Sequence, residues 1–433
     1  MVHKVVIVGG GAGGLELAAK LGRRFGPDHI FLVDAALTHV WKPSLHEVAA
    51  GTLDIHREGL SYPVLARDSG FTFMYGAASQ FDRERRLVIL DPVYDSEGQE
   101  LFSRREVPYD TLVLAVGSQS NYFGTPGATE FAMALDSTAQ AESFRQRLLR
   151  ELVRTQRQLA TNPSHALHIN IVGGGATGVE LAAELVEACK DMRYYGLEQL
   201  DPARSVRITL LEGGERILPA LPARMSQAAH QLLLQRGIQV KAPVRVASVT
   251  KDALFDTQGN RYPNDICVWA AGIEAPAFLA KLGLPLNRIN QVEADLGLRT
   301  ADPNIYAIGD CAQVPWKGED GRYLPARAQV AHQQASFLLP VLGARIRGEH
   351  IPQKEFTFKD YGSLVSVGHN RGVGSLMGVL SGKSWFVEGL VARTMYMSLH
   401  LMHHLAVLGF LQTVSIAIGR LLLKRSTPRV KLH

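Results

Sequence analysis

The stretch His3-Lys-Val-Val-Ile-Val-Gly-Gly-Gly-Ala-Gly-Gly-Leu-Glu-Leu-Ala-Ala-Lys20 joins an apolar, β-branched run to a glycine-rich turn and a Leu/Ala-rich run. This order predicts a buried parallel strand, a tight turn and a helix. Gly9, Gly11 and Gly14 fit the pattern GxGxxG, in which the glycines permit the turn, the approach of a pyrophosphate and the packing of helix on strand. The next apolar run ends at Asp34, 20 residues after Gly14, where a carboxylate can bind a ribose diol. The segment therefore predicts a dinucleotide-binding unit.

The same pattern occurs a second time in the chain. The stretch Leu167–Leu185 repeats the apolar run, the three glycines (Gly173, Gly175 and Gly178) and the helical run. The matching second strand, Val206–Glu212, also ends in an acid, although 34 residues separate that acid from Gly178. Two such units predict an α/β fold with two Rossmann-like domains. They also indicate that electrons pass from one dinucleotide to another.

The composition limits the remaining possibilities. The chain has 433 residues, of which 46% are apolar and 20% charged, so it can bury enough apolar surface to fold. No stretch of 20 strongly apolar residues recurs along it, which excludes a protein with many membrane spans. The three cysteines are odd in number and far apart, which indicates a reducing compartment rather than a disulfide framework.

The positive charge is concentrated at the end of the chain. The net charge is +5, but residues 389–433 hold six basic residues and no Asp or Glu, which leaves the preceding part at −1. We therefore expect no nucleic-acid partner for the body of the protein.

Three later segments resemble the two-dinucleotide flavoprotein reductases. Tyr109–Ser118 is an apolar strand ending in Ala-x-Gly, Val268–Gly272 repeats that ending, and Thr300–Asp310 ends in Gly-Asp. The resemblance implies that the first unit binds FAD non-covalently with Asp310 as a ligand, and that the second binds the nicotinamide cofactor. Glu212 suits a free ribose 2′-hydroxyl and repels a 2′-phosphate, which favours NADH over NADPH.

The disulfide that such reductases use is missing. The corresponding stretch, Trp41–Gly51, contains no cysteine, which argues against a disulfide reductase. Sulfide-oxidising relatives need cysteines at the flavin, whereas Cys189 falls on an expected helix and Cys267 on an expected strand. Cys311 follows the Gly-Asp pair without a partner nearby, so we interpret it as a packing residue, with a redox thiol as the alternative.

The chain is similar to the type II NADH:quinone oxidoreductases, single-subunit respiratory enzymes that pump no ions. The similarity extends from residue 3 to the C-terminus, is closest to the proteobacterial members, and rests on Lys42–Gly51, on Ala328–Gln333 and on the tail. It implies that Gln329 and Gln333, four residues apart on one helix face, line a quinone pocket. Without a flavin beside it, such a pair would simply be a solvated helix face.

Two more residues match positions of that family. Glu180 matches a glutamate near the junction of nicotinamide and flavin; the alternative is a helix carboxylate beside the positive helix terminus. Lys383 matches a lysine near flavin and quinone; the alternative is a solvated surface lysine. With Gln329 and Gln333, these are the expected catalytic residues.

The expected cofactor ligands fall into two sets. Those for FAD are Gly9, Gly11, Ala12, Gly13, Gly14, Asp34, Lys42, Ala115, Gly117, Gly309, Asp310 and Gln329. Those for NADH are Gly173, Gly175, Thr177, Gly178, Glu180, Glu212, Ala271 and Gly272. No metal site is expected, because the three histidines of the tail have no carboxylate or cysteine beside them.

The tail predicts an amphipathic helix. Thr394–Gly419 contains no Lys, Arg, Asp or Glu, and its apolar residues recur every three or four positions. The residues with this spacing are Met395, Leu399, Met402, Ala406, Phe410, Val414 and Ala417, and Leu421 just after this stretch continues it. The other face carries His400, His403, His404 and Gln412, and a basic cluster runs from Arg420 to Lys431. We expect an anchor lying in the membrane surface, with a spanning helix or a helix docked on the body or on a homodimer partner as alternatives.

We therefore expect an FAD domain at residues 1–125 and 295–340, a connecting helical segment at 126–164, an NADH domain at 165–290 and a membrane-anchoring region at 341–433. The expected function is electron transfer from NADH through FAD to a quinone, ubiquinone or menaquinone, at the cytoplasmic face of a bacterial inner membrane. A chain ending near Gly389 should keep FAD, since the dinucleotide ligands precede the cut. The alternatives are a soluble NADH-dependent reductase of a protein such as a ferredoxin, and a redox-responsive flavoprotein that binds partners.

Overall fold

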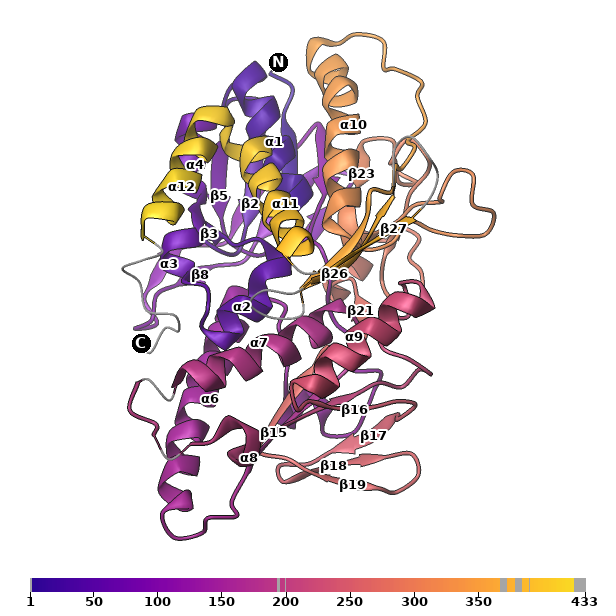
Figure 1. Cartoon of the computed structure of the whole chain (residues 1–433). Helices are drawn as coiled ribbons and strands as arrows, with labels where there is room; N and C mark the ends of the chain where they lie inside the picture. The colour runs from indigo at the N-terminus through magenta and orange to yellow at the C-terminus, as the bar shows by residue number, and fades with distance from the viewer. Residues whose placement is uncertain are drawn as a thin grey trace.

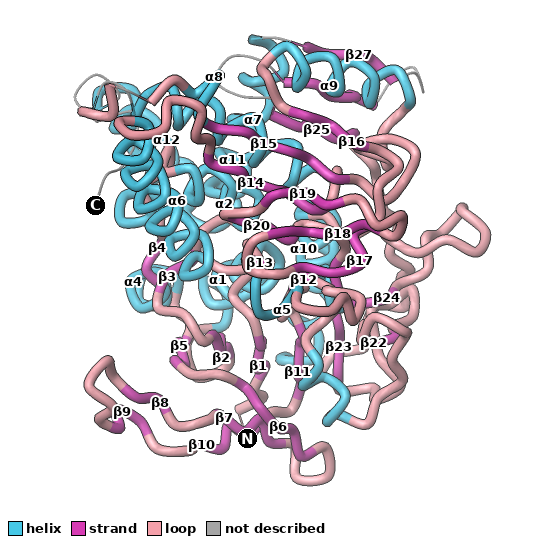
Figure 2. Tube along the Cα trace, turned by 90° about the horizontal axis from the view of Figure 1, so that it is seen from below, coloured by secondary structure: helices cyan, strands magenta, loops and turns pink. Residues whose placement is uncertain are grey.

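The computed structural model describes residues 2–192, 195–198, 200–366, 372–377, 384–388 and 390–423. The first of its two units (Figure 1) is built on a five-stranded parallel sheet with the order β23-β11-β1-β2-β5, which can be followed in Figure 2. The strands are β1 (Val5–Val8), β2 (Ile30–Asp34), β5 (Thr72–Tyr75), β11 (Thr111–Leu114) and β23 (Ile305–Ala307), and α1 (Ala12–Phe25) follows β1. All four residues of β1 are buried, as expected for an apolar run in the middle of a covered parallel sheet.

The second unit repeats this plan with the order β13-β20-β14-β15-β16. Its strands are β13 (Ala132–Met133), β14 (Leu167–Val172), β15 (Val206–Leu211), β16 (Gln239–Lys241) and β20 (Ile266–Trp269), and α7 (Ala176–Met192) follows β14. In both units the central strand leads through the glycines into a helix. This strand pairs in parallel with the one that carries the acid, β2 ending at Asp34 or β15 ending just before Glu212. The predicted α/β fold with two Rossmann-like units is confirmed.

Glycine is required at two places in each turn. Gly9 and Gly173 have φ of +103° and +112°, a region that side chains with a Cβ rarely adopt. A Cβ at Gly14 would lie 1.9 Å from the carbonyl oxygen of Gly9, and one at Gly178 would lie 2.0 Å from that of Gly173. The helix therefore packs on its strand only if these positions lack side chains.

The two units meet through the segment that replaces the disulfide. The short helix α2 (Leu45–Ala50) follows the turn η1 (Lys42–Ser44) and packs against α7 and against α6 (Thr138–Leu159). Leu45, Val48 and Ala49 belong to the apolar core of the second unit. The apolar residues of this segment thus tie the first unit to the second.

Smaller elements extend both units (Figure 2). Two antiparallel sheets are β6 (Ala78–Asp82), β7 (Leu87–Leu90) and β10 (Arg105–Pro108), and β17 (Val246–Val249), β18 (Ala253–Asp256) and β19 (Arg261–Pro263). Paired short strands are β3 (Thr38–His39) with β4 (Leu60–Ser61), β8 (Val93–Tyr94) with β9 (Glu100–Phe102), β12 (Gln119–Ser120) with β21 (Ile273–Glu274), and β22 (Val292–Glu293) with β24 (Ala312–Gln313). The remaining helices and turns are α3 (Ile55–Glu58), α4 (Tyr62–Ser69), α5 (Ala128–Phe131), α8 (Pro202–Ser205), α9 (Ala223–Gln235), η3 (Ala277–Leu282) and η4 (Gly309–Cys311).

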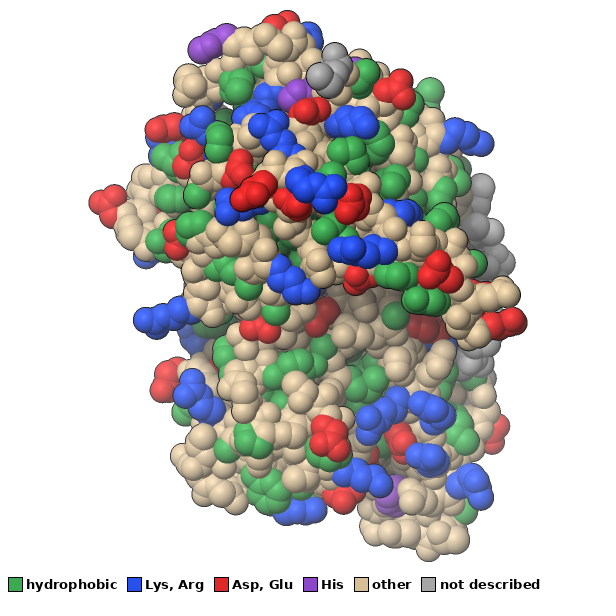
Figure 3. Space-filling model, turned by 180° about the vertical axis from the view of Figure 1, so that it is seen from behind, with side chains coloured by type: hydrophobic (Ala, Val, Ile, Leu, Met, Phe, Trp, Pro, Cys, Tyr) green, Lys and Arg blue, Asp and Glu red, His purple; other side chains and the backbone are tan. Residues whose placement is uncertain are grey.

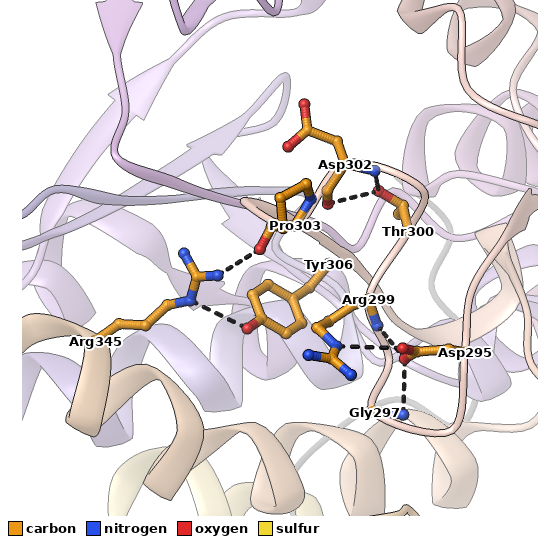
Figure 4. Close-up of polar contacts among 8 residues, drawn as sticks. All are labelled: Asp295, Gly297, Arg299, Thr300, Asp302, Pro303, Tyr306 and Arg345. Carbon is orange, nitrogen blue, oxygen red and sulfur yellow. Dashed lines mark hydrogen bonds and ion pairs between the residues drawn. The ribbon is translucent and has the colours of Figure 1, made fainter. Parts of the chain in front are cut away.

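The long helix α10 (Ala328–Arg347) packs on α1 and fixes strand β23. Arg345 of α10 donates from Nε to the hydroxyl of Tyr306, 3.1 Å away, and from its guanidinium to the carbonyl of Pro303 (Figure 4). Before the strand, Asp295 accepts the backbone N–H groups of Gly297 and Arg299 at 2.8 and 2.9 Å and closes a tight loop. These contacts fix the strand that leads to the Gly-Asp pair.

The C-terminal part forms a small sheet and two helices. The sheet is antiparallel and consists of β25 (Gly362–Ser366), β26 (Gly372–Met377) and β27 (Ser384–Glu388). Helix α11 (Leu390–Leu408) packs on this sheet and on α1, and α12 (Phe410–Leu423) packs on α11 (Figure 1). Our expectation of one continuous helical face is wrong, because Gly409 adopts φ +85° and separates two helices.

Among the residues described, none of the helices combines the length and the apolar character needed to cross a membrane. The basic residues from Lys424 to Lys431 and Lys383 lie outside the described residues. On the face opposite to that of Figure 1, acidic and basic side chains lie interspersed over both halves of the molecule (Figure 3).

Candidate functional site: two dinucleotide sites and their junction

The first glycine loop is held by Asp34 at the end of β2. The Asp34 carboxylate accepts the backbone N–H of Gly10 at 2.7 Å and that of Ala36 at 2.8 Å. Burial raises the pKa of Asp34, although these N–H groups oppose the rise. The hydroxyl of Tyr62 donates to the carbonyl of Gly10 at 2.7 Å, a contact that sequence reasoning missed because α4 lies far away in the chain.

The second loop repeats this arrangement with a longer acid. Glu212 accepts the backbone N–H groups of Gly174 and Gly214, each at 2.6 Å. At Gly175 an added Cβ would meet no atom within 4 Å, and at Gly11 it would meet only the carbonyl oxygen of Ala115 at 3.9 Å. The open side of each loop therefore fits the pyrophosphate of a dinucleotide, which must approach the backbone closely.

Lys42 and Asp310, predicted from distant segments, lie together. Lys42 Nζ donates to the carbonyl of Ser118 at 2.5 Å, and the Ser118 hydroxyl donates to Asp310 Oδ2 at 2.8 Å. Gln291 donates its amide to the Asp310 carbonyl at 2.8 Å. Ser118, which directly follows the Ala-x-Gly ending at Gly117, is a site residue that its position could have indicated.

The start of α10 supports this site. The buried amide of Gln334 accepts the backbone N–H of Gly309 at 2.7 Å. A Cβ at Gly13 would lie 3.0 Å from the carbonyl oxygen of Ala331, so α10 packs closely on the start of α1. Glu16 of α1, which is fully buried, forms an ion pair with Lys20 at 2.5 Å and contacts Nδ1 of His332 on α10. The sequence did not single out Gln334, because the glutamines of the recognised motif, Gln329 and Gln333, lie beside it in the chain.

That pair, Gln329 and Gln333, lies on one face of α10 as expected and binds the backbone before β25. Gln329 donates to the carbonyl of Gly362 at 2.9 Å and accepts the N–H of Tyr361 at 3.3 Å. Gln333 donates to the carbonyl of Lys359 at 2.9 Å and accepts its N–H at 3.0 Å. The two side chains thus hold residues 359–362 against α10.

Glu180 lies where three parts of the chain meet. Only 6% of this α7 residue is exposed; one carboxylate oxygen accepts the N–H of Ser366 at 3.0 Å and the other lies 3.5 Å from Nδ1 of His46 on α2. Burial, with smaller contributions from Glu47 and Glu184, raises the pKa of Glu180 to about 8. Burial lowers the pKa of His46 to about 4. Around pH 7 the contact therefore joins a carboxylic acid and a neutral imidazole.

The predicted residues at the ends of β11 and β20 precede two short strands, β12 and β21, that pair with each other. Ala115 and Gly117 follow β11, while Ala271 and Gly272 follow β20. A Cβ at Gly272 would lie 2.3 Å from the ring of Phe123.

Phe123 is itself an exposed side chain with φ +51°, and its backbone N–H donates to the side chain of Asn121 at 2.7 Å. Trp269 of β20 donates to the Asn121 carbonyl at 2.8 Å. Nothing in the sequence indicated that Phe123 and Asn121 lie beside the predicted residues after β20.

Comparison with known proteins decides the family. Residues 3–335 match the family described as "Pyridine nucleotide-disulphide oxidoreductase". The chain is 38% identical, over the full length of both proteins, to the type II NADH:quinone oxidoreductase of Haemophilus influenzae. The chain belongs to the type II NADH:quinone oxidoreductases. It is also 27% identical to the Mycobacterium tuberculosis enzyme Ndh, over 99% of this chain and 90% of that protein.

A solved structure agrees at the level of the fold. The structure of NDH2 from Plasmodium falciparum in complex with NADH matches over 100% of both chains, with a TM-score of 0.81 and 20% identity. As a member of the type II NADH:quinone oxidoreductases, the chain is an oxidoreductase that uses NADH and FAD.

The three cysteines of this family member are buried thiols. Cys189 lies in α7, Cys267 in β20 and Cys311 in η4, and burial raises the pKa of each thiol to about 12. This environment suits packing residues, since the reactive form is the thiolate.

The three histidines of the tail are buried, so the expectation that the polar face of an in-plane anchor carries them at the membrane surface is wrong. At most 9% of His400, His403 and His404 is exposed, because this face of α11 is turned toward Trp41 and His39 of the first unit. Of the alternatives for the tail, α11 thus matches a helix docked on the body. Within the described ranges, no group of three or more His, Cys, Asp or Glu side chains could hold a metal ion.

Proposed function

We propose that the protein transfers two electrons from NADH through FAD to a membrane quinone, without pumping ions. The overall reaction is NADH + H⁺ + quinone → NAD⁺ + quinol. The observation that carries the proposal is that Gln334 and the pair Gln329 and Gln333 lie on one helix, α10. Gln334 binds the backbone of Gly309 at the proposed flavin site, and the pair lies just before it in that helix. A quinone site at that pair would lie beside the flavin site, which supports direct reduction.

The residues that would hold FAD are the first glycine loop, Asp34, and the group formed by Lys42, Ser118 and Asp310. When bound, FAD accepts a hydride from NADH and passes the two electrons on. In the second unit, Glu212 at the end of its strand would bind the ribose hydroxyls and repel the 2′-phosphate of NADPH. The open side of each loop supports this assignment.

Glu180 is proposed to supply or relay the proton that quinone reduction consumes. Its carboxyl group holds a proton around pH 7, since its pKa is about 8. The neutral ring of His46, 3.5 Å from that carboxyl, can accept a hydrogen bond or share the proton.

The glutamine pair is proposed to bind the quinone headgroup without adding charge. Gln333 donates one amide N–H to Lys359, and an amide group carries two, so a second donor suits a quinone carbonyl. Residues 359–362, which both glutamines bind, would then form one wall of the pocket.

Association with the membrane surface is proposed for α12. Phe410, Leu411 and Ile418 are 70%, 79% and 53% exposed, and residues 394–419 contain no Lys, Arg, Asp or Glu. Large apolar side chains in water favour a partner, and the basic residues that follow favour an anionic lipid surface. The cytoplasmic side is proposed because the free thiols fit a reducing compartment.

The test is steady-state NADH oxidation by the purified holoenzyme with two acceptors, a short-chain quinone and an oxidised iron–sulfur protein. Fast turnover with the quinone alone is the expected result. Preference for the iron–sulfur protein would indicate the reductase alternative. Slow turnover with both acceptors would indicate a flavoprotein that binds partners instead.

A further inference from the structure

Both backbone polar groups of Gly10, in the middle of the first glycine loop, are held by side chains. Its N–H donates to Asp34, and its carbonyl accepts from the Tyr62 hydroxyl at 2.7 Å and from Nδ1 of His39 at 2.9 Å. The loop conformation that would receive the FAD pyrophosphate is therefore determined partly by His39, which follows β2 on the strand β3.

His39 connects this loop to the C-terminal helix. Its second ring nitrogen, Nε2, lies 2.8 Å from Nε2 of His403 on α11. Burial lowers the pKa of His39 to about 4 and that of His403 well below its usual value, so both rings are neutral at pH 7.

The chemistry of neutral imidazole then fixes the direction of each bond. A carbonyl can only accept, so His39 must carry its proton on Nδ1 and use Nε2 as the acceptor. His403 must therefore donate from Nε2, and the two residues form an ordered chain from the helix to the loop carbonyl.

Helix α11 is held against the same unit at a second point. Arg23 of α1 donates to the carbonyl of Val407 at 3.0 Å and to that of Ala406 at 3.5 Å, where a cation suits the negative end of a helix. Val407 is fully buried in the core of the first unit. The ring of Trp41, which lies on the segment after β3, also stacks with that of His403, with centroids 6.5 Å apart.

We infer that His39 and His403 are positioning residues for the glycine loop, so that docking of the C-terminal helix α11 and binding of FAD reinforce each other. Neither side chain needs to touch FAD, because both act through the Gly10 carbonyl. The coupling is reciprocal: whatever docking of α11 adds to FAD affinity, FAD binding adds to docking. A chain ending near Gly389 should therefore hold FAD more weakly than the full chain, which changes our expectation from the sequence.

The first test measures FAD affinity of the full-length protein by the fluorescence of flavin released on dilution. His403→Phe keeps a ring of similar size but has no donor, and His39→Phe interrupts the chain at the other side. One lost hydrogen bond should weaken FAD binding by about 3- to 10-fold. The double variant should weaken it no more than the stronger single variant, because both changes break one chain. Effects that multiply in the double variant would overturn the inference.

Two further variants separate positioning from general destabilisation. His403→Gln keeps an N–H donor and should restore most of the FAD affinity. Met402→Ala alters an exposed residue of the same helix and should leave the affinity unchanged. If His403→Gln binds FAD as weakly as His403→Phe, the proposed hydrogen bond has no role.

The reciprocal effect is read from amide hydrogen exchange of residues 390–408. In the wild type, adding FAD to the flavin-depleted protein should slow exchange in α11, and this slowing should be lost in His403→Phe. Equal slowing in both proteins would overturn the coupling while leaving FAD binding itself, and the proposed quinone activity, unaffected.

Discussion

The carboxylate of Glu180 accepts a 3.0 Å hydrogen bond from the backbone N–H of Ser366 and so connects α7 of the second unit to the end of β25. The contact is almost completely buried, and the pKa of Glu180 rises to about 8 because the charged form loses its hydration. An acid in this state makes the stability of the fold depend on pH.

The wild type should lose stability as the pH rises, and the variant Glu180→Gln should not show this loss. Between the ordinary pKa of 4.5 and the folded value of about 8, the folded state keeps a proton that the unfolded state releases. The free energy of unfolding then falls with pH, by at most about 1.4 kcal/mol for each unit. We expect the thermal midpoint of the variant, relative to that of the wild type, to be higher at pH 9 than at pH 5.

Thermal unfolding of the holoprotein at pH 5, 7 and 9 measures this difference. Glu100→Gln, on the exposed strand β9, is the control and should change the midpoint equally at each pH. A constant offset for Glu180→Gln as well would mean that the carboxyl is ionised in the folded protein.

The sequence predicted those parts of the candidate site whose geometry is local. The glycine loops, Asp34 and Glu212 follow from the backbone geometry that a pyrophosphate and a ribose require, and that geometry lies within about 40 residues. The closeness of Lys42 and Asp310 was implied only by resemblance, because 268 residues separate them in the chain.

The tail shows what periodicity alone leaves open. Three histidines on one face are compatible with water, lipid headgroups or a buried contact, and only the position of His39 and Trp41 selects the last. The role of Gln334 could not be predicted either, because its hydrogen-bond partner, the N–H of Gly309, belongs to another element.

Glu212→Gln should narrow the preference for NADH over NADPH. The amide oxygen of Gln can still accept the N–H of Gly174, but it carries no charge to repel a 2′-phosphate. We expect the ratio of kcat/KM for NADH to that for NADPH to fall about 10-fold, mainly through KM for NADPH. Glu130→Gln, an exposed position on α5, should leave the ratio unchanged. A wild type that used both cofactors equally well would refute the role given to this acid.

Ser118→Ala should reduce the FAD content of the purified protein, and Asp310→Asn should reduce it further. Ser118 links Lys42 to the Asp310 carboxylate through its carbonyl and hydroxyl, so the alanine variant removes the contacts of the hydroxyl and keeps that of the carbonyl. The loss of one hydrogen bond corresponds to about a 3- to 10-fold weaker affinity. The ratio of flavin absorbance to protein absorbance measures the FAD content. Full flavin occupancy in Asp310→Asn would remove that residue from the FAD site.

Gln333→Ala should slow the reduction of quinone and leave the reduction of flavin by NADH near wild type. Among the hydrogen bonds described for its side chain, Gln333 contacts only the backbone of Lys359, whereas the contact with Gly309 is made by Gln334. Stopped-flow absorbance separates the two half-reactions, and Gln258→Ala on the hairpin after β18 is the control. Equal loss of both half-reactions would mean that the glutamine serves the fold rather than the acceptor.

Replacing the exposed apolar residues of α12 should weaken binding to lipid vesicles without loss of flavin. Phe410 and Leu411 are 70% and 79% exposed, and each large side chain that enters the lipid contributes about 1.5 to 3 kcal/mol. The double variant Phe410→Ser, Leu411→Ser should thus lower the affinity for anionic vesicles by at least about 10-fold in a flotation assay. Leu101→Ser, at a 54% exposed residue on β9, is the matched control and should bind normally.

Salt separates the two contributions to that binding. High salt should release only part of the wild-type protein, because screening weakens the attraction of the basic tail to anionic lipid and leaves the apolar contact. It should release the Phe410→Ser, Leu411→Ser variant almost completely, since charge is then the main remaining attraction. Complete release of the wild type by salt would show that α12 does not enter the lipid, and the proposed apolar anchor would be wrong.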